Sequence, residues 1–162
     1  MSMPIERVVT KVVGVSMGPK DSKGNSLRQQ YLAEMKENNT LFVKLIREPE
    51  NAFDNNAIAV YGDYGSGQVQ IGYIQNSSRV CYSCEKEYSK QLVTKDSVLR
   101  EKLNSGVCPS CGGSIGRTGL ASELSEYMDS GYTYKAKVLQ YTGGENKNIG
   151  LNIRIERVMS LT

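Results

Sequence analysis

The chain has 162 residues, of which 39% are hydrophobic and 23% charged, an ordinary composition for one globular domain with a small appendage. Its formal net charge of +3 is too small to establish a nucleic-acid partner, and no apolar run approaches the length of a membrane span. Histidine is absent, which excludes Ser-His-Asp and Cys-His nucleophilic catalysis, and no phosphate-binding GxxxxGK[ST] loop occurs.

The first half of the chain predicts four strands. Their β-branched or alternating pattern covers residues 8–15, 41–46, 57–61 and 69–73. Between the first two strands, residues 27–35 form either a short helix or an irregular segment. Residues 49–56 are rich in turn-forming side chains.

The second half predicts one clear helix and two further strands. Apolar side chains recur at helical spacing over residues 120–128, and Gly131 stands where a C-terminal cap belongs. Residues 132–138 and 149–155 then alternate as strands do. About six strands with one or two helices predict a mainly β protein, either a small barrel or a strongly bent sheet.

All four cysteines lie in a polar segment between these halves. Cys81 and Cys84 form one CxxC pair, and Cys108 and Cys111 form another. The first residues lack the apolar core of a secretion signal, so we expect a cytoplasmic protein, where cysteines bind metal more often than they form disulfides. The spacing predicts one structural Zn²⁺ held by four thiolates. An iron–sulfur cluster, a redox dithiol and incidental cysteines are the alternatives, each less typical of this spacing and context.

The turn-rich segment belongs to a longer motif. Residues 45–60 read L-I-R-E-P-E-N-A-F-D-N-N-A-I-A-V, residues 12–15 read V-V-G-V and residues 71–74 read I-G-Y-I. Together they resemble the HIRAN domain, over about residues 6–80 and 118–158. The resemblance implies a HIRAN-like, OB-like β-barrel from residues 1–80 and 118–162, with residues 81–117 as an inserted zinc ribbon.

The resemblance also implies a function. In the best-understood DNA-remodelling member of the family, the domain captures the free 3′-hydroxyl end of single-stranded DNA. By that analogy Phe53 stacks on a base, Asp54 accepts a hydrogen bond from the terminal hydroxyl, and Tyr73 lies near the same surface. Ser16 and Met17 depart from the pattern of that member, which has a basic residue followed by an aromatic one.

One phosphate contact and one stacking face are therefore missing or supplied from elsewhere, and Lys20, Lys23 and Arg28 in the next segment are the candidates. Met17 itself is also a candidate nucleic-acid contact. The basic charge concentrates at the two ends of the chain. Residues 1–49 carry eight basic and five acidic side chains, and residues 131–162 carry five and two. If the terminal strands are neighbours, they would present a basic surface to a nucleic-acid backbone.

The residues themselves leave simpler interpretations open. Phe53 can pack into the barrel floor, since apolar aromatic side chains are usually buried, and Asp54 can cap the turn backbone. For the whole chain we expect a nucleic-acid-binding module without catalytic activity, with single-stranded DNA or its 3′ ends as the ligand. The alternatives are a protein–protein adaptor that uses the zinc ribbon and a small-nucleotide-binding protein.

Overall fold

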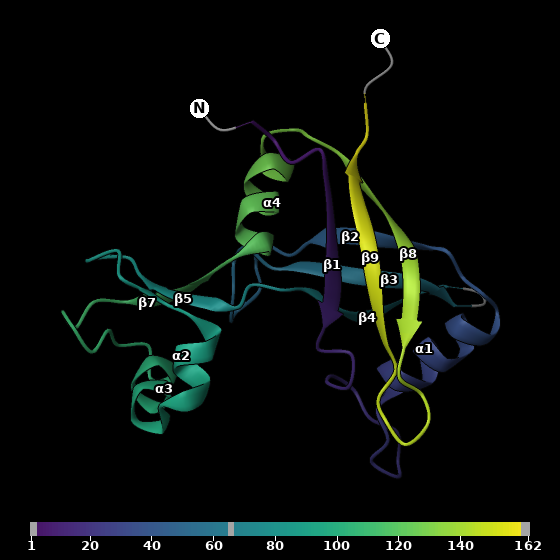
Figure 1. Ribbon diagram of the computed structural model, residues 1–162, viewed down its shortest axis with the longest axis horizontal. Helices are drawn as coiled ribbons and strands as arrows, with labels where there is room; N and C mark the ends of the chain where they lie inside the picture. The colour runs from purple at the N-terminus through teal and green to yellow at the C-terminus, as the bar shows by residue number, and fades with distance from the viewer. Residues whose placement is uncertain (1–2, 65–66, 160–162) are drawn as a thin grey trace.

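The computed structural model describes residues 3–64 and 67–159, which form a closed antiparallel barrel and a smaller three-stranded sheet (Figure 1). The barrel has the strand order β1-β4-β3-β2-β8-β9, and β1 closes it by pairing with both β4 and β9. Its strands are β1 (Arg7–Val13), β2 (Phe42–Arg47), β3 (Ile58–Tyr64), β4 (Gly67–Ile74), β8 (Tyr134–Thr142) and β9 (Gly150–Arg157).

Every second side chain along the strands points inward, and these side chains fill the barrel. In β9, Leu151, Ile153 and Ile155 are fully buried, whereas the residues between them are only half-buried. This period of two directs every second side chain to the interior. Each strand predicted from the sequence corresponds to one barrel strand, so the mainly β, six-stranded barrel is confirmed.

Two helices cover the barrel at opposite ends (Figure 1). α1 (Leu27–Glu37) begins at Ser26, whose hydroxyl accepts the Gln29 N–H at 3.3 Å, and it buries Leu32. α4 (Leu120–Asp129) buries Leu124 into the same core. The segment near residues 27–35, left open between helix and irregular chain, is therefore helical.

The inserted segment forms a separate lobe beside the barrel, which we call the ribbon (Figure 1). Its sheet has the order β6-β5-β7, with β5 (Ser78–Cys81), β6 (Glu87–Tyr88) and β7 (Ile115–Thr118). Two short helices, α2 (Lys90–Lys95) and α3 (Ser97–Asn104), complete it. The described residues therefore hold four helices rather than the one or two expected from the sequence.

The β1–β4 seam of the barrel depends on a close approach at Gly72. A Cβ atom at this position would overlap the Val13 carbonyl oxygen and a methyl group of Val12. The seam itself is short, since β1 pairs with β4 through Val12 opposite Ile74 and Val13 opposite Tyr73. Glycine is therefore required here by lack of space, not by an unusual φ angle.

We expect Gly72→Ala to lower the free energy of unfolding by about 1–3 kcal/mol, because the added methyl group forces the seam apart. Urea denaturation measures the effect. Gly67→Ala is the matched control in the same strand, since its Cβ would meet no atom within 4 Å. Equal stability of the two variants would contradict this account of the seam.

Candidate metal centre and nucleic-acid interface

The four cysteines of the inserted lobe come together at one point. Their sulfur atoms all lie within 4.8 Å of one another, and none forms a disulfide. Cys81 Sγ is 3.4 Å from Cys111 Sγ, and Cys84 Sγ is 3.8 Å from Cys108 Sγ. A tetrahedral ion with metal–sulfur bonds of about 2.3 Å needs sulfurs about 3.8 Å apart. The cluster can therefore bind a metal ion, as the two CxxC pairs predicted.

Backbone N–H groups support these sulfurs. The Cys84 N–H donates to Cys81 Sγ, and the Gly113 N–H donates to Cys111 Sγ, each at 3.4 Å. Gly112 has a φ of 78°, which glycine adopts without steric strain. The hydrogen bond from Cys84 N–H also lowers the pKa of the Cys81 thiol below its usual range. A lower pKa favours the thiolate, which is the form that binds metal.

Tyr88 stands behind one of the ligands. Its buried hydroxyl lies 3.3 Å from Cys108 Sγ and 3.3 Å from Ser110 Oγ. The hydrogen bond with Tyr88 lowers the pKa of Cys108 to about 6. Such a partner orients a ligand and stabilises its charged form.

The lobe has little else to hold it together. Apart from two of the cysteines, its cluster of buried side chains consists of Tyr88 and Leu103. So small a core is rarely stable alone, and a metal commonly supplies the missing stability. Because four thiolates complete a tetrahedral shell, no coordination position remains for a substrate.

The turn that carries Phe53 and Asp54 is held firmly from behind. Asn51 Oδ1 accepts the N–H groups of Phe53 at 2.9 Å and Asp54 at 3.1 Å. Arg47 donates to the Asn55 carbonyl at 2.9 Å and forms a two-bond contact with the Asp129 carboxylate at 3.0 Å. These bonds fix the turn without using the Phe53 ring.

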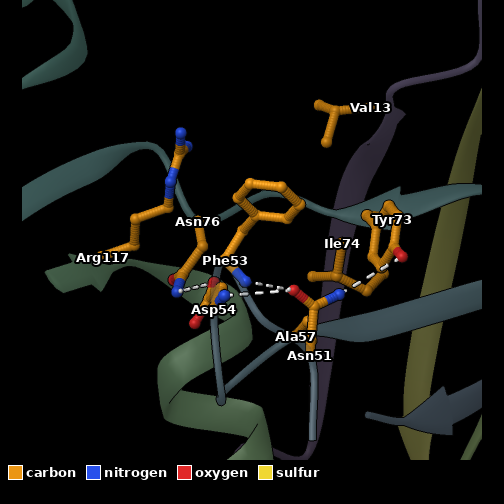
Figure 2. A pocket seen from close by; sticks show the side chains of 9 residues that line it. All are labelled: Val13, Asn51, Phe53, Asp54, Ala57, Tyr73, Ile74, Asn76 and Arg117. Carbon is orange, nitrogen blue, oxygen red and sulfur yellow. Dashed lines mark hydrogen bonds between the residues drawn. The ribbon is translucent and has the colours of Figure 1, made fainter. Parts of the chain in front are cut away.

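Phe53 is 92% exposed, so the interpretation that it packs into the barrel floor is wrong. Its ring stands over a hollow of about 260 Å³. Figure 2 shows the ring between the Arg117 side chain and the pair Val13 and Tyr73. The residues that line the hollow are Val13, Asn51, Phe53, Asp54, Ala57, Tyr73, Ile74, Asn76 and Arg117.

Asp54 lines the same hollow and also caps the turn, as the simpler interpretation had it. Its Oδ1 accepts the Asn56 N–H and its Oδ2 accepts an N–H of the Asn76 amide, both at 2.9 Å. A carboxylate has about four acceptor sites, and these hydrogen bonds occupy two of them.

Tyr73 is half-buried at the edge of the hollow. Its hydroxyl donates to Glu48 Oε1 at 2.9 Å, and the Arg28 guanidinium lies 5.7 Å from its ring centre. Burial, together with the hydrogen bond to Glu48, raises the pKa of Tyr73 above its usual value. The Tyr73 hydroxyl is thus already bound to Glu48, and the Arg28 guanidinium already lies beside the Tyr73 ring.

The remaining predicted contacts lie outside the residues that line the hollow. Arg28 is only 7% exposed and donates to the Gly14 carbonyl at 2.9 Å beneath the loop that follows β1. Met17, which is 65% exposed, and Lys20 lie on that loop. Phe53, Asp54 and Tyr73 therefore line one hollow. Arg28 contacts the Tyr73 ring without lining that hollow, and Met17 and Lys20 do not line it either.

Two polar residues of the hollow, Asn76 and Arg117, lie outside the HIRAN-like motif and were not predicted from the sequence. Asn76 is 8% exposed and donates to Ser122 Oγ at 2.8 Å, while its Oδ1 accepts the Ser122 N–H at 3.1 Å. It thereby supplies a cap for α4, whose own N-cap residue, Gly119, has no side chain. Arg117 comes from β7 of the inserted lobe. A single polar residue in a polar stretch carries no periodic signal, so neither position stands out.

The basic terminal strands are neighbours, as the charge distribution suggested. β9 lies between β1 and β8, and Arg154 stands opposite both Val9 and Lys137. The outer face of these strands carries more basic than acidic side chains: Arg7, Lys11, Lys135, Lys137 and Arg154 against Glu156. Lys11 and Val13 share the outward side of β1, so this face leads towards the hollow.

Comparison of the chain with protein-family models, with curated proteins and with solved structures finds no match. None of the helices among the described residues has the length and apolar character needed to cross a membrane.

We expect Tyr88→Phe to weaken metal binding about 10- to 100-fold, because it removes the hydroxyl beside Cys108 Sγ. Competition with a chromophoric chelator measures the change. Tyr82→Phe, at a tyrosine that is 62% exposed, is the control for loss of a hydroxyl in the same lobe. A Tyr88→Phe variant with unchanged affinity would show that the hydroxyl does not support the ligand.

Proposed function

We propose that this chain is a nucleic-acid-binding protein without catalytic activity, and that it binds single-stranded DNA, preferably at a 3′ end, beside Phe53. The observation that carries the proposal is the exposed Phe53 ring, held by a rigid turn at the edge of a hollow. An apolar ring so exposed offers a flat surface on which a base stacks. The resemblance of the surrounding motif to the HIRAN domain supports the same ligand.

Asp54 gives the hollow a second recognition element. Asp54 lines the hollow together with Phe53, and each of its carboxylate oxygens accepts one hydrogen bond within the protein, which leaves one further acceptor position on each. A terminal 3′-hydroxyl can donate to it, whereas a 3′-phosphate would be repelled by its charge. The hollow therefore favours an unmodified 3′ end.

The basic outer face of β1, β8 and β9 supports the proposal from a distance. Its positive field would attract a polyanion and raise the rate of encounter, with a strong dependence on salt. Lys135 and Lys137 need not touch the bound strand for this effect.

We propose that the metal is Zn²⁺ and that its role is structural. Four thiolates in a closed tetrahedral arrangement are typical of zinc, and a reduced cytoplasmic environment keeps them available. Zn²⁺ would be held by Cys81, Cys84, Cys108 and Cys111 and would stabilise the ribbon fold.

A protein–protein adaptor is the second candidate. Four apolar side chains of the ribbon are exposed, namely Tyr82, Leu92, Val98 and Val107. A partner that covered them would bind the ribbon rather than the hollow. Binding of such a partner would be insensitive to changes at Phe53.

We expect Phe53→Ala to weaken binding of a short 3′-hydroxyl DNA strand by about 1–3 kcal/mol, or about 5- to 150-fold, because one stacked base is lost. Fluorescence anisotropy at low salt measures the affinity. Phe53→Tyr, which keeps an aromatic ring, should bind like the unaltered protein, and a 3′-phosphate strand should bind more weakly than the hydroxyl form.

Two results would contradict the proposal. One is the absence of binding by the unaltered protein to either strand at low salt. The other is full competition by a mononucleotide at the same affinity, which would favour the small-nucleotide alternative.

Elemental analysis of the purified protein tests the metal. We expect about one Zn²⁺ per chain, lost from Cys108→Ser, because three thiolates and a hydroxyl bind zinc poorly. The barrel should remain folded in this variant, since its core is separate from that of the ribbon. Iron or no metal in the unaltered protein would contradict the assignment.

A further inference from the structure

A second hollow continues from the first. It measures about 290 Å³, lies where the barrel meets the ribbon, and shares Val13, Asn76 and Arg117 with the hollow beside Phe53. Its other lining residues come from the link between β4 and β5, from β5 itself and from α2: Gln75, Ser77, Arg79, Lys90, Val93 and Thr94. The second hollow therefore adjoins the first through these shared residues. We call the second hollow the junction groove.

The junction groove is basic. Arg79, Lys90 and Arg117 line it, and no acidic side chain does. All three cations belong to the lobe beside the barrel, in β5, α2 and β7, although Arg79 precedes the predicted insertion of residues 81–117. Among the described residues, none of the three forms a salt bridge with a carboxylate.

The strand register places two of these cations side by side. Arg79 of β5 stands directly opposite Arg117 of β7. Like charges in opposed positions destabilise a sheet, and a bound anion would remove that cost. Burial, followed by the neighbouring charge of Arg117, lowers the pKa of Arg79, in keeping with two cations that face each other without a counter-ion.

The two cations differ in how firmly they are held. Arg79 donates to Asn104 Oδ1 at 3.1 Å, which fixes its guanidinium against α3. Arg117 is exposed and makes no side-chain hydrogen bond within the described part of the chain, so its donors are free for a ligand. In Figure 2 its side chain stands beside the Phe53 ring.

We propose that the inserted ribbon binds the phosphate backbone of the same strand whose terminal base stacks on Phe53, through Arg117, Lys90 and Arg79 in the junction groove. This inference rests on the proposed function and extends it. Guanidinium groups bind phosphate through paired hydrogen bonds, and Lys90 adds a point charge. The ribbon is thus part of the binding surface as well as a metal-stabilised insertion.

Arg117 brings a cation from the ribbon to the Phe53 hollow as well as to the junction groove. The metal cluster keeps β5 and β7 together, because Cys81 is the last residue of β5 and Cys108 and Cys111 precede β7. Phosphate binding by Arg79 and Arg117 therefore requires that the ribbon is folded.

The experiment compares salt dependence among variants with a 3′-hydroxyl DNA strand of about eight nucleotides. The double variant Lys90→Ala/Arg117→Ala should bind more weakly at low salt. Its plot of log affinity against log salt should be shallower by about 1.4, since each lost phosphate contact to a single strand contributes about 0.7. Lys95→Ala/Lys102→Ala, which removes two ribbon charges outside the groove, should keep the original slope.

A dinucleotide and a Phe53→Ala variant separate the two proposals. A dinucleotide that occupies only the Phe53 hollow should bind the unaltered protein and the single variant Lys90→Ala equally, because Lys90 lines only the second hollow. Phe53→Ala should lower affinity with little change of slope, because stacking releases no counter-ions.

If Phe53→Ala weakens binding while Lys90→Ala/Arg117→Ala leaves the slope unchanged, the ribbon inference is wrong and the proposed function stands. The converse result supports the ribbon groove and contradicts the role of Phe53. If the unaltered protein does not bind at all, both proposals fail. Metal content and circular dichroism of each variant confirm that the ribbon and barrel remain folded.

Discussion

One buried amide, that of Asn76, ties together the three parts of the chain that shape the hollow. Its nitrogen donates to Asp54 of the turn and to Ser122 of α4, and its oxygen accepts the Ser122 N–H. Asn76 also lies where the chain leaves the barrel for the ribbon. Because a buried polar group is costly when unsatisfied, these bonds allow one relative arrangement of turn, helix and ribbon. The position of Phe53 beside Arg117 follows from it.

The ribbon and the barrel contribute different kinds of side chain to one surface. The barrel supplies a rigid apolar face, since the Phe53 turn is anchored through Asn51 and Arg47. The ribbon supplies positive charge at the edge of that face through Arg117 and Arg79. Its own apolar core is small, and the four-cysteine cluster at the end of β5, which can bind a metal ion, lies close to the strands that carry these cations. In the proposed function, the basic outer face of β8 and β9 acts at longer range.

The sequence was most informative where a pattern repeats. Alternation predicted the six barrel strands, and the two CxxC pairs predicted the cysteine cluster. It was uninformative for α2, whose six residues bury no side chain, and for isolated polar residues such as Asn76 and Arg117. The exposure of Phe53 could not be read from its residue type, because apolar rings are usually buried. The hydrogen bonds of Asn51 and Arg47 hold the turn in the conformation that leaves the ring exposed.

We have proposed that a single strand lies along the Phe53 hollow and the junction groove. Nuclear magnetic resonance on the ¹⁵N-labelled protein, titrated with a short 3′-hydroxyl DNA strand, would locate the bound strand on the protein surface. We expect the largest changes in amide chemical shift on residues 51–56, 75–77 and 117. Changes confined to the outer face of β8 and β9, around Lys135, Lys137 and Arg154, would contradict it.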